Sequence, residues 1–404
     1  MPNHCESGAA ENLRFAGRSV TPPVAPYGLA ELVRYFLYLG AAGFGGPVAL
    51  VEYMHRDLVE LRGWITEDEY REGLALANLS PGPLAAQLAI YLGFVHYRFV
   101  GASLVGAAFV LPSFLIVVAV GWAYLRFGGL PWMQAVFYGV GAAIIGIIAW
   151  SAYRLTRKTM GRDPLLWIIF GAMAAITAIT ETERIELFPL AGLAVWVARR
   201  PRSRPGPKPI AAAALLPLGA IEPAASSGLG EIFWFFFKAG AFVFGSGLAI
   251  VPFLYGGVVG GYGWLNAQQF LDAVAVAMIT PGPVVITTAF IGYLVAGLPG
   301  AMVAALATFL PAYLLTVFPA PYFRKYGNRP SLSAIVDGVT AAAIGAITGA
   351  VIVLGRRAII DVPTALLAVV ALLILWKSPR RIPEPILVAG AAAAGLALYP
   401  LAIG

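Results

Sequence analysis

Two halves of this sequence repeat one another. When the chain is aligned with itself at an offset of 200 residues, residues 31–83 match residues 231–283 without a gap. After a slip of one residue the match continues from Phe109-Val-Leu-Pro112 to Phe309-Leu-Pro311. The identical pairs include Gly40 with Gly240, Phe44-Gly45 with Phe244-Gly245, Gly63-Trp64 with Gly263-Trp264, and Pro81-Gly82-Pro83 with Pro281-Gly282-Pro283. Self-similarity at a fixed spacing indicates a duplicated structural unit.

The repeated unit is too apolar for a water-soluble fold. Hydrophobic residues make up 60% of the 404 residues and charged residues 12%, whereas a soluble domain carries about 25% charged residues. The chain therefore predicts an all-α polytopic membrane protein with about 12–13 transmembrane helices of about 20 residues each. The expected spans are 31–51, 74–95, 100–125, 131–153, 164–180, 185–198, 209–221, 231–256, 270–296, 299–320, 332–354, 362–376 and 383–403.

Four regions follow from this pattern. Residues 1–27 are polar and predict a disordered cytoplasmic tail, not a cleaved signal peptide. Residues 28–198 form the N-terminal repeat and residues 228–404 the C-terminal repeat. Between them, 199–227 reads as a basic linker with a short crossing segment at 209–221.

The basic residues predict how the halves are oriented, because Lys and Arg in loops stay cytoplasmic. One set of first-half loops carries Arg14, Arg18, Arg98, Arg154, Arg157, Lys158, Arg162 and the run 199–208, and the other carries Arg56, Arg62, Arg71, Arg126 and Arg184. The second half reverses the bias. One set of its loops carries Arg324, Lys325, Arg329, Lys377, Arg380 and Arg381, and the set that corresponds to the basic 154–162 loop of the first half carries only Arg356 and Arg357. If 209–221 crosses, the repeats are inverted, with the N-terminus cytoplasmic and the C-terminus periplasmic. Inverted repeats are typical of secondary transporters.

Two features interrupt the apolar segments in both halves and are the candidate substrate site. The first is Phe44-Gly45-Gly46 and its counterpart Phe244-Gly245-Ser246; the second is Ser80-Pro81-Gly82-Pro83 and Thr280-Pro281-Gly282-Pro283. Proline and glycine at this spacing break a helix, and Ser80 and Thr280 are expected to cap the helix that follows. A helix N-terminus inside the membrane favours an anion. The alternative is that Pro-Gly-Pro only kinks a packed helix.

A few charged residues lie within or near the apolar segments. Lys238 is expensive to bury and is a candidate counter-charge, although it could instead extend its ammonium to the membrane surface. Glu72 and Asp272 each lie eight residues before the Ser/Thr-Pro-Gly-Pro motif. They are candidates for coupling transport to protons or for pairing with Lys238; ordinary carboxylates at the membrane edge are the alternative.

Other chemistries lack their signatures in the sequence. The three histidines share no ligand-like spacing, Cys5 is the single cysteine, and no phosphate-binding or dinucleotide-binding loop occurs. We therefore expect no metal, no cofactor, no enzyme activity and no nucleic-acid partner. An intramembrane enzyme would need a catalytic constellation that the residues do not supply. The sequence does not separate a carrier from a passive channel, and it leaves a homodimer open.

The motifs at 43–47, 63–64, 80–83 and 109–112, with their second-half copies, resemble those of the chromate ion transporter family. The resemblance extends over about 30–400 and implies a long-chain, two-domain member. Such a protein is expected to export chromate across the bacterial inner membrane and so give chromate resistance. Sulfate is a similar tetrahedral dianion that it could also carry. The alternative function is a proton- or cation-coupled importer of sulfate or a related oxyanion.

Overall fold

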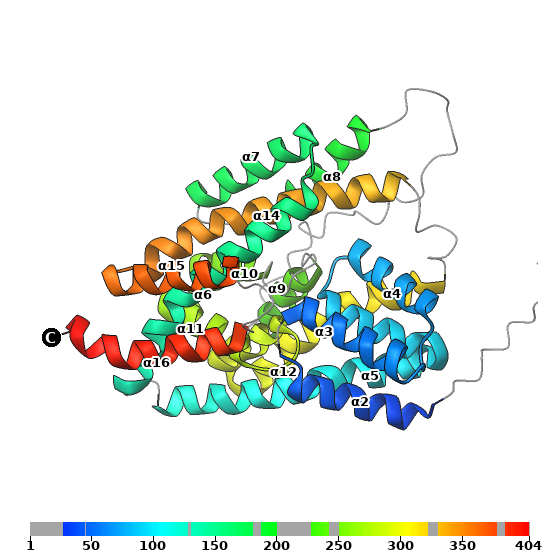
Figure 1. Cartoon of the computed structure of the whole chain (residues 1–404), viewed down its shortest axis with the longest axis horizontal. Coiled ribbons are helices and arrows are strands. Elements are labelled where there is room, and N and C mark those ends of the chain that lie inside the picture. The colour runs from blue at the N-terminus through cyan, green and yellow to red at the C-terminus, as the bar shows by residue number, and fades with distance from the viewer. Residues whose placement is uncertain are drawn as a thin grey trace, which may run out of the picture.

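The structure, a computed structural model, describes residues 27–44, 46–127, 131–180, 187–199, 228–241, 250–321, 330–377 and 384–403. Over these residues the secondary structure is helical, without strands (Figure 1). The first repeat forms α2 (Leu29–Ala42), α3 (Gly46–Met54), the π-helix η1 (His55–Leu61), α4 (Glu67–Leu79), α5 (Leu84–Phe127), α6 (Pro131–Thr159), α7 (Pro164–Thr180) and α8 (Leu187–Ala198). The second repeat forms α9 (Leu229–Ala241), α10 (Val251–Tyr255), η5 (Gly256–Gly261), α11 (Ala267–Ile279), η6 (Val284–Ile286), α12 (Thr287–Val317), α14 (Pro330–Ala358), α15 (Val362–Lys377) and α16 (Glu384–Ile403).

Several of these helices have the length and apolar character of membrane spans. Among the described residues, four such helices are Leu84–Phe127, Trp132–Arg157, Val284–Val317 and Ser333–Ala358. Shorter apolar helices are Pro164–Thr180, Leu187–Ala198, Ala267–Ile279, Val362–Lys377 and Ile386–Tyr399. The prediction of an all-α polytopic membrane protein is confirmed.

The longest helix, α5, is a hairpin of two legs. Arg98 has a left-handed φ of 51° with ψ −139°, and a Cβ placed on Gly101 would lie 2.2 Å from the carbonyl oxygen of Gly93. In a straight helix these two residues would be about 12 Å apart. The chain therefore reverses between a short leg (84–97) and a long leg (99–127). In α12 the same reversal occurs at Gly297, with φ 62°, between a short leg (287–295) and a long leg (298–317).

The first two predicted spans are also hairpins, and this differs from the expected topology. The Tyr27 and Trp64 rings stack at a centroid distance of 4.8 Å, and His96 Nε2 lies 3.4 Å from Glu69 Oε1. Tyr27, Trp64, Glu69 and His96 therefore share one end of the molecule, which we call the N-terminal end. The prediction that Arg56, Arg62 and Arg71 lie in loops at the end opposite to Arg98 was wrong, because the chain turns back within 31–51 and again within 74–95.

The two long legs run in opposite directions. Ser103 Oγ, at the start of the α5 long leg, lies 2.8 Å from Tyr313 Oη, near the end of the α12 long leg. Gly40 of α2 packs on the carbonyl of Phe109, and Gly240 of α9 packs in the same way on that of Thr308, so α2 and α9 each follow the long leg of their own repeat. The second repeat is thus upside-down relative to the first, as the charge pattern predicts.

The inversion also places the ends of the linker. Arg199 Nη2 lies 2.7 Å from Asp163 Oδ2, and Arg199 Nη1 lies 2.5 Å from Asp337 Oδ2, at the N-terminal end. Helix α9 packs along α12, with Gly240 on Thr308 as Gly40 of α2 is on Phe109, so in the inverted repeat α9 begins at the opposite end. The predicted short crossing segment 209–221 lies outside the described residues, but the chain on either side of it lies at opposite ends.

The outer helices are exchanged between the repeats. Helix α6 packs on α15 and α16, and α14 packs on α7 and α8, while α6 and α14 also contact each other (Figure 1). A Cβ on Gly139 would lie 2.0 Å from the Ala391 carbonyl oxygen, and one on Gly338 would lie 2.5 Å from that of Ala191. Small residues permit this close backbone approach between helices in lipid. Each repeat therefore packs around a helix of the other.

Candidate substrate site

The helix breaks predicted from sequence are the tips of the hairpins. We name them by residue: the Gly43 tip (43–46), the Ser80 tip (80–83) and the Thr280 tip (280–283). At the Gly43 tip, Gly46 has φ 73°, a left-handed conformation that favours glycine. The tip that would contain Phe244, Gly245 and Ser246 lies outside the described residues, as does Gly45.

Two tips from opposite repeats meet in the interior. The Gly282 N–H donates a hydrogen bond of 2.8 Å to the Gly43 carbonyl oxygen. The fully buried Ser113, on the α5 long leg, donates through Oγ to the Gly40 carbonyl oxygen at 3.2 Å. Gly282 has φ 91°, and a Cβ there would lie 2.0 Å from Ser113 Oγ. Because the hairpins enter from opposite ends, this contact marks the centre of the molecule.

The Ser80 tip packs at the equivalent place on the other long leg. A Cβ on Gly82, which has φ 141°, would lie 3.0 Å from the Ala312 side chain. Ser80 Oγ donates to the Leu315 carbonyl oxygen at 3.4 Å. Ser113 lies ten residues beyond Ser103, which is level with Tyr313, so the two Pro-Gly-Pro tips are staggered by about 15 Å along the antiparallel legs. The nearest tip to Thr280 among the described ones is therefore the Gly43 tip.

Ser80 and Thr280 do not cap the helices that follow them. Ser80 ends α4 and Thr280 ends α11, with ψ values of 140° and 134° and with their N–H groups bonded to the carbonyls of Leu76 and Val276. Thr280 Oγ1 also donates to the Val276 carbonyl oxygen at 2.6 Å. The predicted N-cap role was wrong, because two prolines delay the next helix to residue 84 or 284.

Gln87 is a buried polar residue at the Ser80 tip that sequence reasoning missed. Its Nε2 donates to the Pro81 carbonyl oxygen at 2.8 Å, while Oε1 has no hydrogen-bond partner among the described residues. The side chain is 0% exposed. At the equivalent place Thr287 bonds its own helix, with Oγ1 donating to Val284 O at 2.8 Å. The signal available in the sequence was an amide within an otherwise apolar run.

Lys238 and Phe44 lie toward the periphery of this centre. The half-buried Lys238 places Nζ 6.0 Å from the centroid of the Trp234 ring, one turn earlier on α9. None of the ion pairs formed among the described residues includes Lys238. Its counterpart Tyr38 is 68% exposed, and Phe44 is 39% exposed. The described contacts do not join Lys238 to the Ser80 tip or the Thr280 tip.

Glu72 and Asp272, the coupling candidates, differ in burial although they are equivalent in sequence. Glu72 is half-buried. Asp272 is 4% exposed and accepts hydrogen bonds from Tyr124 Oη at 2.7 Å and Gln268 Nε2 at 2.9 Å. Of this equivalent pair, the structure therefore buries the carboxylate of the second repeat, Asp272, and leaves that of Glu72 half-buried.

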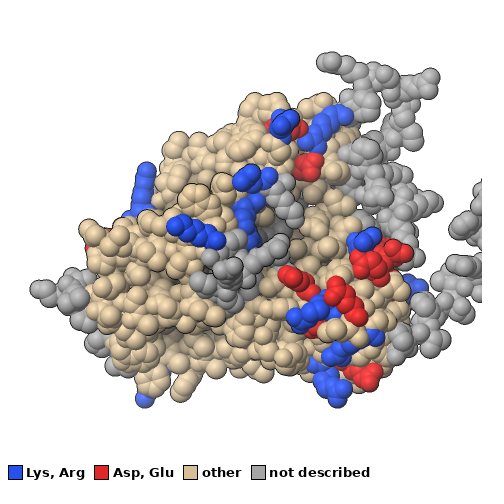
Figure 2. All heavy atoms as spheres, in the orientation of Figure 1, with Lys and Arg blue, Asp and Glu red and all other residues tan. Residues whose placement is uncertain are grey.

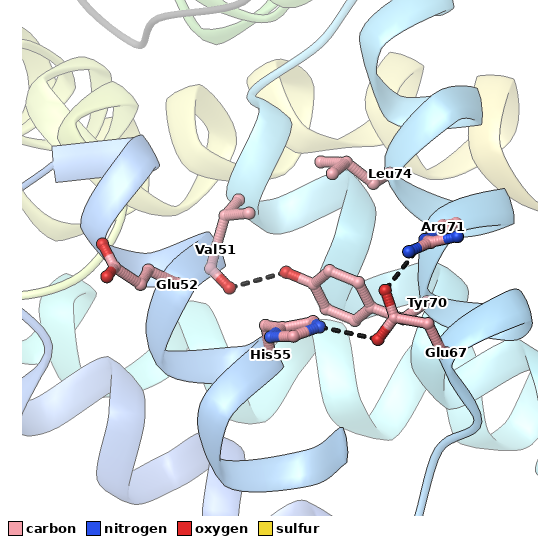
Figure 3. Close-up of a pocket in the computed structure, with 7 residues that line it drawn as sticks. All are labelled: Val51, Glu52, His55, Glu67, Tyr70, Arg71 and Leu74. Atoms are coloured by element: carbon pink, nitrogen blue, oxygen red, sulfur yellow. Dashed lines mark hydrogen bonds and ion pairs between the residues drawn. The ribbon is translucent and has the colours of Figure 1, made fainter. Parts of the chain in front are cut away.

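A polar hollow lies at the N-terminal end, away from the tips. Its volume is about 390 Å³, and it is lined by Val51, Glu52, His55, Glu67, Tyr70, Arg71 and Leu74 (Figure 3). Glu67 bonds His55 Nε2 and Arg71 Nε, both at 2.8 Å. The hydrogen bond from His55 keeps the pKa of Glu67 below its usual range, with a further contribution from Arg71. Acidic and basic side chains gather over this end, while much of the remaining visible surface is uncharged (Figure 2).

The family match covers both repeats. The family described as Chromate transporter matches residues 30–198 and again residues 230–396. The chain belongs to this family. A match to each half agrees with the duplication seen in the sequence. Membership of this family supports chromate as the transported substrate.

Curated relatives agree over nearly the full length. The chain is 65% identical over 394 residues to the "Chromate transport protein" of Cupriavidus metallidurans, covering 96% of each chain. It is 62% identical over 383 residues to the "Probable chromate transport protein" of Synechococcus elongatus, covering 92% of this chain and 96% of that one. A "Chromate transport protein" of Pseudomonas aeruginosa is 30% identical over 405 residues, covering 95% of each. No solved structure matches the chain.

Proposed function

We propose that this family member exports chromate from bacteria by alternating access around the centre where the Gly43 and Thr280 tips meet. The observation that carries the proposal is the Gly282–Gly43 hydrogen bond, since it joins hairpins that enter from opposite ends. Separating the tips from one end at a time would expose the centre to one side and then to the other. Export of this kind gives chromate resistance.

The tips offer neutral donors in place of fixed charges. Helix N-termini and backbone N–H groups bind oxyanions, and such bonds are strong where water is excluded. The proposed binding residues are Ser80, Pro81, Gly82, Pro83, Thr280, Pro281, Gly282, Pro283, Phe44, Gly45, Gly46, Phe244, Gly245 and Ser246, with Lys238 as counter-charge. For the hydroxyls of Ser80 and Thr280 to donate to chromate, they must first leave the carbonyls they now bond.

The membrane potential favours export. With the inside negative, moving a dianion outward gains about 4.6 kcal/mol per 100 mV, because each charge is worth about 2.3 kcal/mol. Import of sulfate, the alternative function, would move a dianion against the same membrane potential and would need coupled cations to offset this free-energy cost.

The proposed topology has both repeats in the bacterial inner membrane, with the N-terminal end cytoplasmic. The hairpin folding moves Arg56, Arg62 and Arg71 to the same end as Arg98, so the positive-inside bias of the first repeat increases. Tyr399 Oη donates to Gln134 Oε1 at 2.9 Å at the opposite end, and this contact supports a periplasmic position for the C-terminal side. Lipid surrounds the outer helices, and a homodimer is compatible with this arrangement.

The test is chromate counterflow in proteoliposomes with an imposed potential, with sulfate as the competing substrate. We expect Gly282→Ala to reduce chromate flux at least about tenfold, since a methyl group there meets Ser113 Oγ at 2.0 Å and each 1.4 kcal/mol is tenfold in rate. Gly141→Ala is the matched control, because a Cβ at that position meets no atom within 4 Å. Equal flux in the two variants, or preference for sulfate in the unmodified protein, would refute the proposal.

A further inference from the structure

We propose that Asp272 is a proton-binding site that takes up a proton when chromate binds. This inference rests on the proposed function, and it assigns to one carboxylate the link between the anion and the proton. Ionisable side chains within membrane helices are costly and mark ion or proton pathways by default.

The surroundings of Asp272 identify it as a charge without a counter-charge. Its two bonds come from neutral donors, Tyr124 on the α5 long leg and Gln268 one turn earlier on α11. Among the described residues, no Lys, Arg or His forms an ion pair with it. Asp272 lies in the interior of α11 and has no capping role there, because Asn266 and Gln269 form the cap of that helix.

The side chains that contact the Asp272 carboxylate are Tyr124 and Gln268, and the helices packed against α11 carry several tyrosines and one arginine nearby in the fold. From α10, Tyr255 packs against Phe270, with Arg357 of α14 5.4 Å above the Tyr255 ring. From α12, Tyr293 lies against Gly121 of the α5 long leg. The remaining neighbours, α6 and α16, contribute Tyr138 and Tyr399, whose rings contact each other. Arg357 is the one cation of this set, and Tyr255 is the ring it covers.

Two rigid connections join Asp272 to the centre. Along α11, Asp272 precedes Thr280 by eight residues, about 12 Å. Along the α5 long leg, its partner Tyr124 lies on the same helix as Ser113, which touches the Thr280 tip. Asp272 and Tyr124 thus tie together the same two helices that meet again at the tip.

The sign of the linkage follows from charge. A dianion at the Thr280 tip repels the carboxylate of Asp272, and a nearby like charge favours the protonated form. Linkage is reciprocal, so protonation must in turn strengthen chromate binding. A protonated carboxyl carries one O–H donor, and the oxygen that holds the proton is a weaker acceptor, so the bond from Tyr124 or the bond from Gln268 weakens. Proton binding therefore changes the contact between α11 and the α5 long leg.

A second Tyr–Asp pair in the chain provides a matched control. Tyr138 Oη donates to Asp361 Oδ2 at 2.5 Å. Asp361 is half-buried and has an evident structural role, since its Oδ1 accepts the Thr364 N–H at 2.9 Å at the start of α15. Both aspartates therefore accept a hydrogen bond from a tyrosine. Of the two, only Asp272 is buried in the interior of the helix packing.

The experiment measures protons taken up when chromate is added to the purified full chain in weakly buffered detergent solution, and then proton movement with chromate in proteoliposomes. We expect uptake approaching one proton per bound chromate in the unmodified protein. Asp272→Asn should bind chromate with no proton uptake, whereas Asp272→Glu and Asp361→Asn should retain it. Proton release on chromate binding, or undiminished uptake in Asp272→Asn, overturns the inference.

A second variant covers the case in which Asp272→Asn does not fold. Tyr124→Phe removes one donor to the carboxylate without changing charge, so the protonated form should persist to higher pH. Proton uptake should remain, and the pH midpoint of chromate binding should move upward; an unchanged midpoint contradicts the assignment. Absence of chromate binding and flux in the unmodified protein would instead refute the proposed function.

Discussion

The connectors of the two repeats adopt one fold from very different sequences. In the first repeat, η1 (His55–Leu61) carries both acidic and basic side chains, whereas η5 (Gly256–Gly261) consists of glycine and valine. Both are π-helices, and both lead to a helix that begins with a capping box, Thr66 with Glu69 or Asn266 with Gln269. Backbone turns and caps therefore form both connectors, and the charges of the first repeat are not needed for this backbone conformation.

The largest expected effect tests the shared backbone geometry. Gly40→Val and Gly240→Val should each prevent folding, because a Cβ would lie 2.3 Å from the Phe109 carbonyl oxygen or 2.1 Å from that of Thr308. Overpacking typically costs about 1–3 kcal/mol, and here the nearest neighbour is backbone, which cannot rotate away. The measurement is the yield of monodisperse protein in detergent. Tolerance in one repeat and failure in the other would show that the long legs are not equivalent.

A smaller effect tests the capping boxes. Thr66→Ala and Asn266→Ala should each lower the free energy of unfolding by about 1 kcal/mol, since each removes a side-chain acceptor for an N–H in the first turn. The comparison requires similar losses of thermal stability in the two variants. Replacement of Thr180, which ends α7 and bonds within its own helix, should have less effect. A loss confined to Thr66 would mean that the charged connector depends on its cap and the glycine connector does not.

The smallest expected effect separates the repeats by pH. The hydrogen bond from His96 lowers the pKa of Glu69 to about 2, burial opposes it, and bonds from Thr66 add to the lowering. Because the folded pKa is depressed, this carboxylate stabilises the fold above its ordinary value of 4.5 and the contribution is lost as the pH falls toward 2. The second repeat has the uncharged Gln269 at this position, so it lacks this pH-dependent contribution to stability.

The measurement is thermal stability of the unmodified protein and of Glu69→Gln at pH 7 and pH 3. We expect the unmodified protein to lose more stability on acidification than the variant does. Gln269→Ala serves as the matched variant in the second repeat, and its acid sensitivity should equal that of the unmodified protein. An identical loss in Glu69→Gln would show that Glu69 does not carry the acid sensitivity.

Much of the site was accessible from sequence because the residues involved act locally. Pro-Gly-Pro ends a helix wherever it occurs, so the positions of the Ser80 and Thr280 tips followed directly from the motif. The turn at Arg98 was anticipated as a gap between apolar segments, although not as a left-handed residue. Gln87 and Ser113 were missed, because a single polar residue in an apolar run does not reveal which neighbour it faces.

The sequence by itself determined the membrane class, the duplication, the helix breaks and the inversion, since each depends on composition, periodicity or charge along the chain. Only the tertiary structure decided that the broken segments turn back as hairpins, that α6 and α14 exchange partners, and that Asp272 meets Tyr124, 148 residues earlier. These features are contacts between residues distant in sequence. Close backbone packing at small residues stabilises these contacts. A pattern along the sequence does not specify which helix surfaces will pack together.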